Sequence, residues 1–100
     1  CGFIVTSRER AKELSKDPNV EIQIVSYGYS RVQKGFMAKA PVPAAEMALK
    51  NAGLKVSDIH VFKTHAPFVI NDIYMAKMMG IDVNNINNYG TSLIFGHPQG

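Results

Sequence analysis

The sequence predicts an α/β fold, an incomplete layered segment in which a mixed sheet carries flanking helices. The chain alternates between two kinds of segment. Some are short and apolar with the period of a β-strand, and in the others apolar residues recur at helical spacing. This order favours helices packed on a sheet with at least some parallel strand pairing. With 100 residues, 46% of them hydrophobic, the chain is long enough for one small unit with a modest core.

The first two predicted elements lie at the start of the chain. Residues 2–7, GFIVTS, predict a short apolar strand. A helix is expected next, from Ser7 or Arg8 to about Lys16, because Thr6 and Glu9 have the spacing of a capping box. The turn-forming residues 17–19, DPN, then end this helix.

A second strand and a loop follow. Residues 20–29, VEIQIVSYGY, alternate apolar and polar side chains, which predicts a strand with one apolar face formed by Val20, Ile22 and Ile24. Residues 30–40, SRVQKGFMAKA, have neither a helical nor a strand period. We therefore expect a loop there.

The remainder predicts helix, strand and helix. Pro43 stands near the start of the first of these helices and Gly53 just past its end. Residues 60–64, HVFKT, predict a third strand, and Phe68 to Met79 predict a helix that Gly80 closes. The expected apolar stripes are Ala45, Ala48, Leu49 and Ala52 on the first helix, and Val69, Ile73 and Ala76 on the second. The asparagine-rich residues 84–88 predict turns.

The composition argues against several classes of protein. Eleven basic and eight acidic residues give a net charge of +3, and the basic residues are dispersed, whereas nucleic-acid binding favours a basic stripe. No stretch has the apolar length of a membrane span, and no basic-then-apolar leader precedes the first strand. We therefore expect neither a nucleic-acid nor a membrane partner, although an anionic small ligand or a plain solvated surface would fit the charge. The single cysteine, Cys1, favours a reducing compartment, and we expect the cytoplasm.

Both ends of the chain indicate a piece of a longer protein. The first residues already belong to a predicted strand, without a turn before it, and the sequence stops at Gly100, where another helix could begin. We therefore expect neighbouring elements outside these residues.

The histidines are the candidates for proton chemistry. Side chains alternate along a strand, so His60 and His65 point apart and a metal pair between them is not expected. No Cys-x-x-Cys or His-Glu-x-x-His pattern supports a metal site either. His60 is most simply a surface residue. His65 follows its strand at the edge where α/β sheets tend to bind ligands, with a structural role as the alternative.

His97 lies on backbone of restricted freedom. Gly96 before it tolerates angles that other residues resist, and Pro98 after it holds His97 in an extended conformation. These restrictions fit either an ordinary turn or the seat of a proton-handling group.

The motif GHPQG at residues 96–100 resembles the Gly-His-Pro-x-Gly motif of the thiolases, and other motifs accompany it in order. NNYGTS is similar to their Asn-x-x-Gly-Gly stretch, and HAPF falls where many thiolases have Asn-Glu-Ala-Phe. MAKAPVPAAEMALKNAGL resembles their Met-Gly-x-Gly-Pro-x-Pro-Ala helix start, and GFIVTSRERAKEL resembles the strand and helix that close their first half. The resemblance thus covers essentially the whole chain.

The resemblance implies an acyl-CoA C-acyltransferase with two related α/β halves packed as a five-layered fold. Residues 1–19 would end the N-terminal half, and residues 20–100 would begin the C-terminal half. The expected substrate is an acyl-CoA thioester, which reacts by Claisen condensation or thiolysis without a cofactor or metal. By the same analogy, the full-length protein is expected to be a homodimer or homotetramer.

The resemblance also implies roles for individual residues. His97 matches the histidine that assists the nucleophilic cysteine and helps to form an oxyanion hole. His65 stands where most thiolases have an asparagine that holds a catalytic water, and a histidine there is similar to the sterol-carrier-type branch. The expected substrate-binding residues are Met37, Phe68 and Gly96, with core packing as the alternative for the first two.

The two cysteines of thiolase chemistry are not among these residues. In the family one cysteine attacks the acyl carbonyl and another moves the proton at the reacting carbon. Cys1 matches neither position, and we expect it to be a buried, inert thiol.

Besides His65, two further positions depart from the family pattern. Ala66 stands at the glutamate position and Thr91 at the second glycine, so acyl specificity stays open. The alternative function is a non-catalytic thiolase-like module that binds CoA or lipid. A nucleic-acid-binding fragment ranks far below both.

Overall fold

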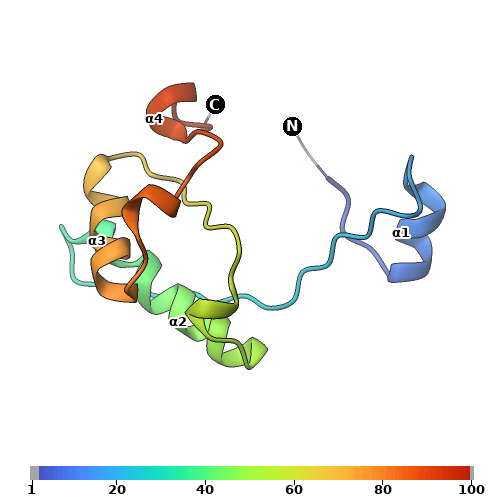
Figure 1. Cartoon of the computed structure of the whole chain (residues 1–100), viewed down its shortest axis with the longest axis horizontal. Coiled ribbons are helices and arrows are strands. Elements are labelled where there is room, and N and C mark those ends of the chain that lie inside the picture. Colours follow the sequence, from blue (N-terminus) through green and yellow to red (C-terminus); the bar gives the residue numbers. More distant parts are fainter. Residues whose placement is uncertain (1–2, 100) are drawn as a thin grey trace.

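Irregular chain joins four α-helices in the computed structural model, which describes residues 3–99. The helices are α1 (Arg8–Leu14), α2 (Pro41–Ala52), α3 (Val69–Met79) and α4 (Ser92–Phe95). Short 3-10 turns lie between them, namely η1 (Met37–Lys39), η2 (Val56–Asp58) and η3 (Val83–Asn85). Figure 1 shows α2 and α3 together in one body, whereas α1 lies apart at the end of a long connection. Cys1 falls outside the described residues, so its expected burial stays a prediction.

The predicted sheet is not present within residues 3–99. The segments 20–29 and 60–64 are irregular, and so is the described part of the first predicted strand. A single parallel bridge pairs Phe62 with Ile86, and the Asn87 N–H donates to the Phe62 carbonyl at 3.0 Å. An extended segment becomes a stable strand only when neighbouring strands pair with its backbone groups, and these segments lack such neighbours here. The mixed sheet therefore remains a prediction for the full-length protein.

The strand-like alternation of side chains is nevertheless visible in their burial. Phe62 and Thr64 are half-buried, whereas Val61, Lys63 and His65 are exposed. Strand alternation predicts these two faces, although His60, which it places on the face of Phe62 and Thr64, is exposed. The segment therefore has the side-chain arrangement of a strand with one covered face.

The first helix begins at Arg8 as predicted, but its capping residue and its end differ from the prediction. The cap is Ser7, whose Oγ accepts the Arg10 N–H at 3.3 Å, so the predicted Thr6–Glu9 capping box is wrong. The helix ends at Leu14, two residues before Lys16, and has no buried residue. Because no residue of α1 is buried, little packing favours its continuation.

Glu21 ties α1 to the chain that follows it. Its carboxylate accepts from Arg8 Nε at 2.7 Å and lies 2.9 Å from Lys12 Nζ. The hydrogen bonds from Arg8 and then Lys12 lower the pKa of Glu21 to about 2, so this carboxylate stays ionised well below its ordinary titration range. All three side chains are solvent-exposed, so the pairs orient α1 more than they stabilise it.

The two longer helices lie close to where they were predicted. α2 begins at Pro41, two residues before Pro43, and both prolines stand in the first turn, where a missing N–H costs little. Gly53 (φ 68°) and Gly80 (φ 68°) end α2 and α3 in the left-handed conformation that glycine adopts without strain. The stripe predicted on α2 is half-buried along its length.

The core is small and centres on α3. The buried apolar residues among those described are Val42, Ala66, Ala76 and Ile86. α3 packs against α2, η1 and η3. Its predicted apolar side is only partly covered, because Ala76 is buried while Val69 and Ile73 are exposed. Asp72, on the same helix, accepts hydrogen bonds from Thr64 and Asn87, and these bonds turn α3 so that Asp72, and not Val69 or Ile73, faces the interior.

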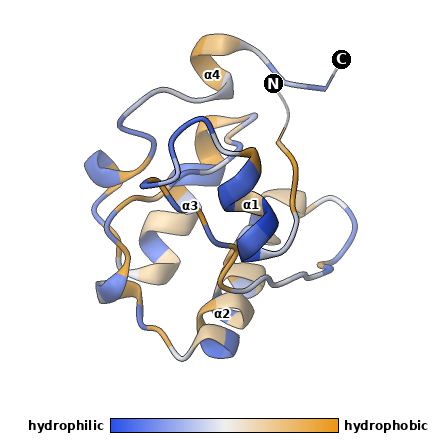
Figure 2. Ribbon diagram, turned by 90° about the vertical axis from the view of Figure 1, so that its right-hand side faces the viewer, coloured by the Kyte–Doolittle hydropathy of each residue, from blue (hydrophilic) through white to orange (hydrophobic). Residues whose placement is uncertain are grey.

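Many large apolar side chains are left outside this core. Ile22, for example, is 93% exposed, and Figure 2 shows hydrophobic stretches along irregular chain as well as on α4, while α1 is largely hydrophilic. Among the described residues, no helix combines the length and the apolar character needed to cross a bilayer.

Residues 26–30 lie along α2 through alternate side chains. Ser26 Oγ donates to the Ala48 carbonyl at 2.7 Å, and Ser30 Oγ donates to the Ala40 carbonyl at 2.6 Å. Between them, Gly28 touches the helix backbone, since a Cβ built on it would lie 2.0 Å from the Ala44 carbonyl oxygen. Glycine is required here by the close approach.

Replacing Gly28 by alanine should therefore separate this segment from α2. The added methyl group meets backbone atoms that cannot move aside, so we expect Gly28→Ala to lower the free energy of unfolding by about 2 kcal/mol. Chemical denaturation measures the loss. The control is Tyr29→Ala, which removes an exposed neighbouring side chain and should change stability by about 0.5 kcal/mol or less. Equal effects of the two variants would contradict the proposed contact.

Candidate functional site

Two of the predicted site residues are in direct contact, although 32 positions separate them in sequence. His65 Nε2 lies 3.0 Å from His97 Nε2, and the rings meet edge to face with centroids 4.3 Å apart. Both side chains are solvent-accessible. The structure thus brings together the two histidines that the sequence singled out.

A short helix delivers His97 to this position. Thr91 caps α4, its hydroxyl accepting the Leu93 N–H at 2.9 Å, and Gly96 (φ 86°) ends the helix one residue before His97. The Gln99 N–H then donates to His97 Nδ1 at 3.1 Å. α4 was not predicted from the sequence, although a threonine cap and a closing glycine around an apolar run were a signal for it.

A buried asparagine holds the segment that carries His65. Asn87 Oδ1 accepts the Thr64 N–H at 2.9 Å, while Asn87 Nδ2 donates to Thr64 Oγ1 at 2.6 Å and to Asp72 Oδ2 at 2.9 Å. The Thr64 hydroxyl in turn donates to the second oxygen of Asp72. We call Thr64, Asp72 and Asn87 the asparagine clamp. It joins the residue before His65 to α3 and to the turn after η3.

Every polar atom of the Asn87 side chain forms hydrogen bonds within the clamp. Asn87 is 7% exposed, and its amide oxygen and both amide hydrogens are bonded. Its φ of 60° is left-handed, a conformation that asparagine tolerates better than most residues. A buried polar group that is fully satisfied specifies one arrangement of the chain around it.

The chain turns sharply just after His65. Ala66 is buried and has a φ of 39°, which is strained for a residue with a Cβ and stands directly before Pro67. Lys63, on the other side of His65, donates its Nζ to the Gly90 carbonyl. The chain on both sides of His65 is thus constrained, which limits how far the imidazole can move.

The hydrogen bonds fix the direction of the histidine pair. Because the Gln99 N–H donates to His97 Nδ1, that nitrogen carries a lone pair, and the proton of the neutral ring is on Nε2. His97 Nε2–H therefore donates to His65 Nε2. One imidazole presents a donor and the other an acceptor at the same point.

Such a pair can act on a polar bond placed beside it. The Nε2–H of His97 can donate to an oxygen that becomes negatively charged, and the lone pair of His65 Nε2 can accept from a water or a thiol. Within residues 3–99, no group of three His, Cys, Asp or Glu side chains gathers in a way that could hold a metal ion.

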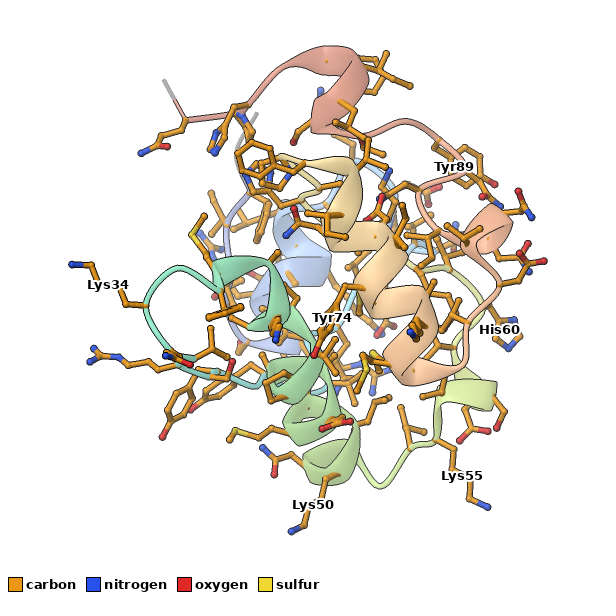
Figure 3. The ribbon with its side chains drawn as sticks, turned by 90° about the vertical axis from the view of Figure 1, so that its left-hand side faces the viewer. Lys34, Lys50, Lys55, His60, Tyr74 and Tyr89 are labelled. Carbon is orange, nitrogen blue, oxygen red and sulfur yellow. The ribbon has the colours of Figure 1, made fainter. Side chains whose placement is uncertain are left out.

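The remaining predicted residues lie in different places. Phe68 precedes α3, three positions after His65, and is 60% exposed. Met37 lines a separate hollow of about 290 Å³ with residues 30–35, and neither histidine borders it. His60 points away from the ribbon and does not approach α4 (Figure 3). The roles of Met37, Phe68 and Gly96 at a substrate stay predictions.

Sequence reasoning missed the residues that position the pair. Asn87 and Ser92 lie in the NNYGTS stretch matched to the family motif, but neither was given a positioning role, and Asp72 was not singled out. Asp72 stands in the first turn of a predicted amphipathic helix, where an acidic residue is usually explained by the helix dipole. Long-range hydrogen bonds have no period in sequence, so no pattern could join these residues.

Known proteins resemble this chain along most of its length. A family model described as the C-terminal domain of thiolase matches residues 19–100. The β-ketothiolase BktB of Cupriavidus necator is 34% identical over 96 residues, which are 96% of this chain and 24% of that protein. The 3-ketoacyl-CoA thiolase of Salmonella typhimurium is 35% identical over 103 residues, 100% of this chain and 26% of that protein. The chain spans about a quarter of the length of the curated relatives it matches.

Solved structures show the same likeness. Human mitochondrial 3-ketoacyl-CoA thiolase superposes with a TM-score of 0.70 at 30% identity, over 76% of this chain and 19% of that one. The acetyl-CoA acetyltransferase of Bacillus anthracis superposes with a TM-score of 0.77 at 24% identity, over 92% of this chain and 23% of that one. The described residues thus share the fold of the corresponding part of these α/β enzymes.

The asparagine clamp should be essential to the stability of this region. Asn87→Ala leaves the Thr64 N–H and Oδ2 of the Asp72 carboxylate without a partner, so we expect a loss of about 3 kcal/mol in the free energy of unfolding. Chemical denaturation tests this, with Asn88→Ala as the control, because Asn88 is exposed beside it. Equal losses of stability in both variants would show that the hydrogen bonds of the asparagine clamp do not stabilise this region.

Proposed function

The chain belongs to the thiolase family, and we propose that the full-length protein is an acyl-CoA C-acyltransferase that catalyses Claisen condensation of acyl-CoA or its reversal by thiolysis. The matched relatives support this, since they are named as a β-ketothiolase, an acetyl-CoA acetyltransferase and a 3-ketoacyl-CoA thiolase. The observation that carries the proposal is the 3.0 Å contact between His65 Nε2 and His97 Nε2. Two imidazoles at one exposed point provide the donor and acceptor that acyl transfer needs.

His97 is proposed to stabilise the charge that forms on the acyl carbonyl. A cysteine supplied from outside these 100 residues attacks the thioester carbon, and negative charge develops on the carbonyl oxygen. The Nε2–H of His97, which donates to His65 Nε2 in the structure, is proposed to turn to that oxygen as the charge grows, so that a donor held close by stabilises the charge. CoA then leaves as its thiol, with the acyl group held on the cysteine.

His65 is proposed to hold a water or a reacting proton beside that carbonyl. Its Nε2 is an acceptor in the structure, as shown by the direction of the bond from His97. Asparagine in the corresponding family position holds a water in the same way. The histidine supports placement of this protein in the sterol-carrier-type branch, and Thr91 in place of the second glycine leaves the acyl specificity open.

The rest of the site and the assembly follow from the same proposal. Phe68, at the start of α3 and near His65 in sequence, together with Met37 and Gly96, is proposed to contact the acyl group. Residues 1–19 are proposed to end the first thiolase half, with residues 20–100 beginning the second. The full-length protein is proposed to be a homodimer or homotetramer without a bound cofactor, located in the cytoplasm.

Removing His97 tests the proposed activity most simply. In the full-length protein, His97→Ala should lower kcat for thiolysis of acetoacetyl-CoA by about 100-fold, because the donor to the developing oxyanion is lost. The matched control is His60→Ala, which removes an exposed histidine distant from α4 and should leave turnover within about twofold of the wild type.

Two outcomes would count against this account. If His97→Ala keeps full turnover, His97 does not belong to the active site. If the wild-type protein binds acyl-CoA but releases no product, the non-catalytic module that binds CoA or lipid is the correct function.

Two substitutions of His65 distinguish a role in hydrogen bonding to a water from a role in filling space. His65→Asn should retain more activity than His65→Ala, because an amide still offers a donor and an acceptor for a water and a methyl group offers neither. The expected difference is about tenfold in kcat/KM, measured on the same acyl-CoA substrate. Equal activities of the two variants would show that His65 fills space without holding a water.

A further inference from the structure

We infer that Ser92 is a positioning residue that holds His65 in the tautomer on which the histidine pair depends. Ser92 is the first residue of α4 and is half-buried, and its Oγ lies 2.9 Å from His65 Nδ1. The inference rests on the proposed function for its effect on turnover. The hydrogen bond itself is independent of that function.

The backbone N–H of Gln99 determines which ring nitrogen of His65 carries the proton. The Gln99 N–H makes His97 Nδ1 an acceptor, so His97 Nε2 is the donor and His65 Nε2 the acceptor. A neutral imidazole has one N–H, so the proton of His65 is on Nδ1. That N–H donates to Ser92 Oγ.

The opposite direction is incompatible with the contact between the rings. If the Ser92 hydroxyl donated to His65 Nδ1, the proton of His65 would be on Nε2. The Nε2–H of His65 would then face the Nε2–H of His97 across 3.0 Å, and neither nitrogen would offer a lone pair to accept a hydrogen bond. Ser92 is therefore the acceptor, and its hydroxyl hydrogen stays available for another partner.

One short helix thus supplies both His97 and the group that prepares His65 for it. Ser92 begins α4 and His97 follows its closing Gly96, so Thr91, which caps α4, orders both at once. A hydrogen bond on one ring nitrogen sets which tautomer the other presents. Without Ser92, both tautomers of His65 would be populated. In a fraction of the molecules the Nε2–H of His65 would face the Nε2–H of His97, and no hydrogen bond could join the two rings.

The test is a double-mutant cycle in the full-length protein. Ser92→Ala should lower kcat by about tenfold with little change in KM, and Ser92→Thr, which keeps a hydroxyl, should stay within about twofold of the wild type. In a His65→Ala background, Ser92→Ala should have no further effect, because Ser92 acts only through His65. A further tenfold loss in that background, or a Ser92→Thr variant as impaired as Ser92→Ala, would overturn the inference.

A spectroscopic measurement tests the tautomer without turnover. In protein labelled with ¹⁵N-histidine, multiple-bond ¹H–¹⁵N correlations distinguish Nδ1–H from Nε2–H rings, and His65→Asn assigns the signal of His65. We expect the Nδ1–H form in the wild type and a mixture in Ser92→Ala. An Nε2–H ring in the wild type, or an unchanged spectrum in the variant, would overturn the role of Ser92. If the tautomers behave as expected in a protein without thiolase activity, the proposed function fails and the hydrogen bond stands.

Discussion

The side chain of Asn87 holds three separate parts of the chain in one arrangement. It bonds to the backbone and hydroxyl of Thr64 and to the carboxylate of Asp72, and its own N–H reaches the carbonyl of Phe62. Within residues 3–99 the apolar core is small, so hydrogen bonds that are buried and fully paired decide the local geometry to an unusual degree. The position of His65 follows from this clamp.

The second constraint is the direction of the bonds beyond the clamp. A backbone N–H at Gln99 sets the proton of His97, His97 sets the acceptor on His65, and Ser92 receives the remaining N–H. Each step removes one alternative protonation state. The result is a donor and an acceptor held at the same point before a substrate arrives, which is the kind of preorganisation that lowers the barrier to acyl transfer.

The two longer helices were predicted well from the sequence, whereas the predicted strands stay unconfirmed, for one physical reason. Prolines and glycines mark helix ends locally, so α2 and α3 were placed to within two residues. A strand depends on partners elsewhere, and residues 20–29 have none within the described chain. His65 and His97 were recognised through motifs. Asn87 and Ser92 also lie in a quoted motif, but they act through long-range contacts that no local pattern encodes. Exposed apolar side chains such as Ile22 agree with a chain whose neighbours belong to a larger protein.

The most direct test of the central claim is a crystal structure of the full-length protein with an unreactive acyl-CoA analogue. The account predicts that the acyl carbonyl oxygen lies within about 3.2 Å of His97 Nε2, with His65 Nε2 beside it and Ser92 still bonded to His65 Nδ1. A structure in which the two imidazoles lie apart, or in which the carbonyl binds away from both, would contradict it.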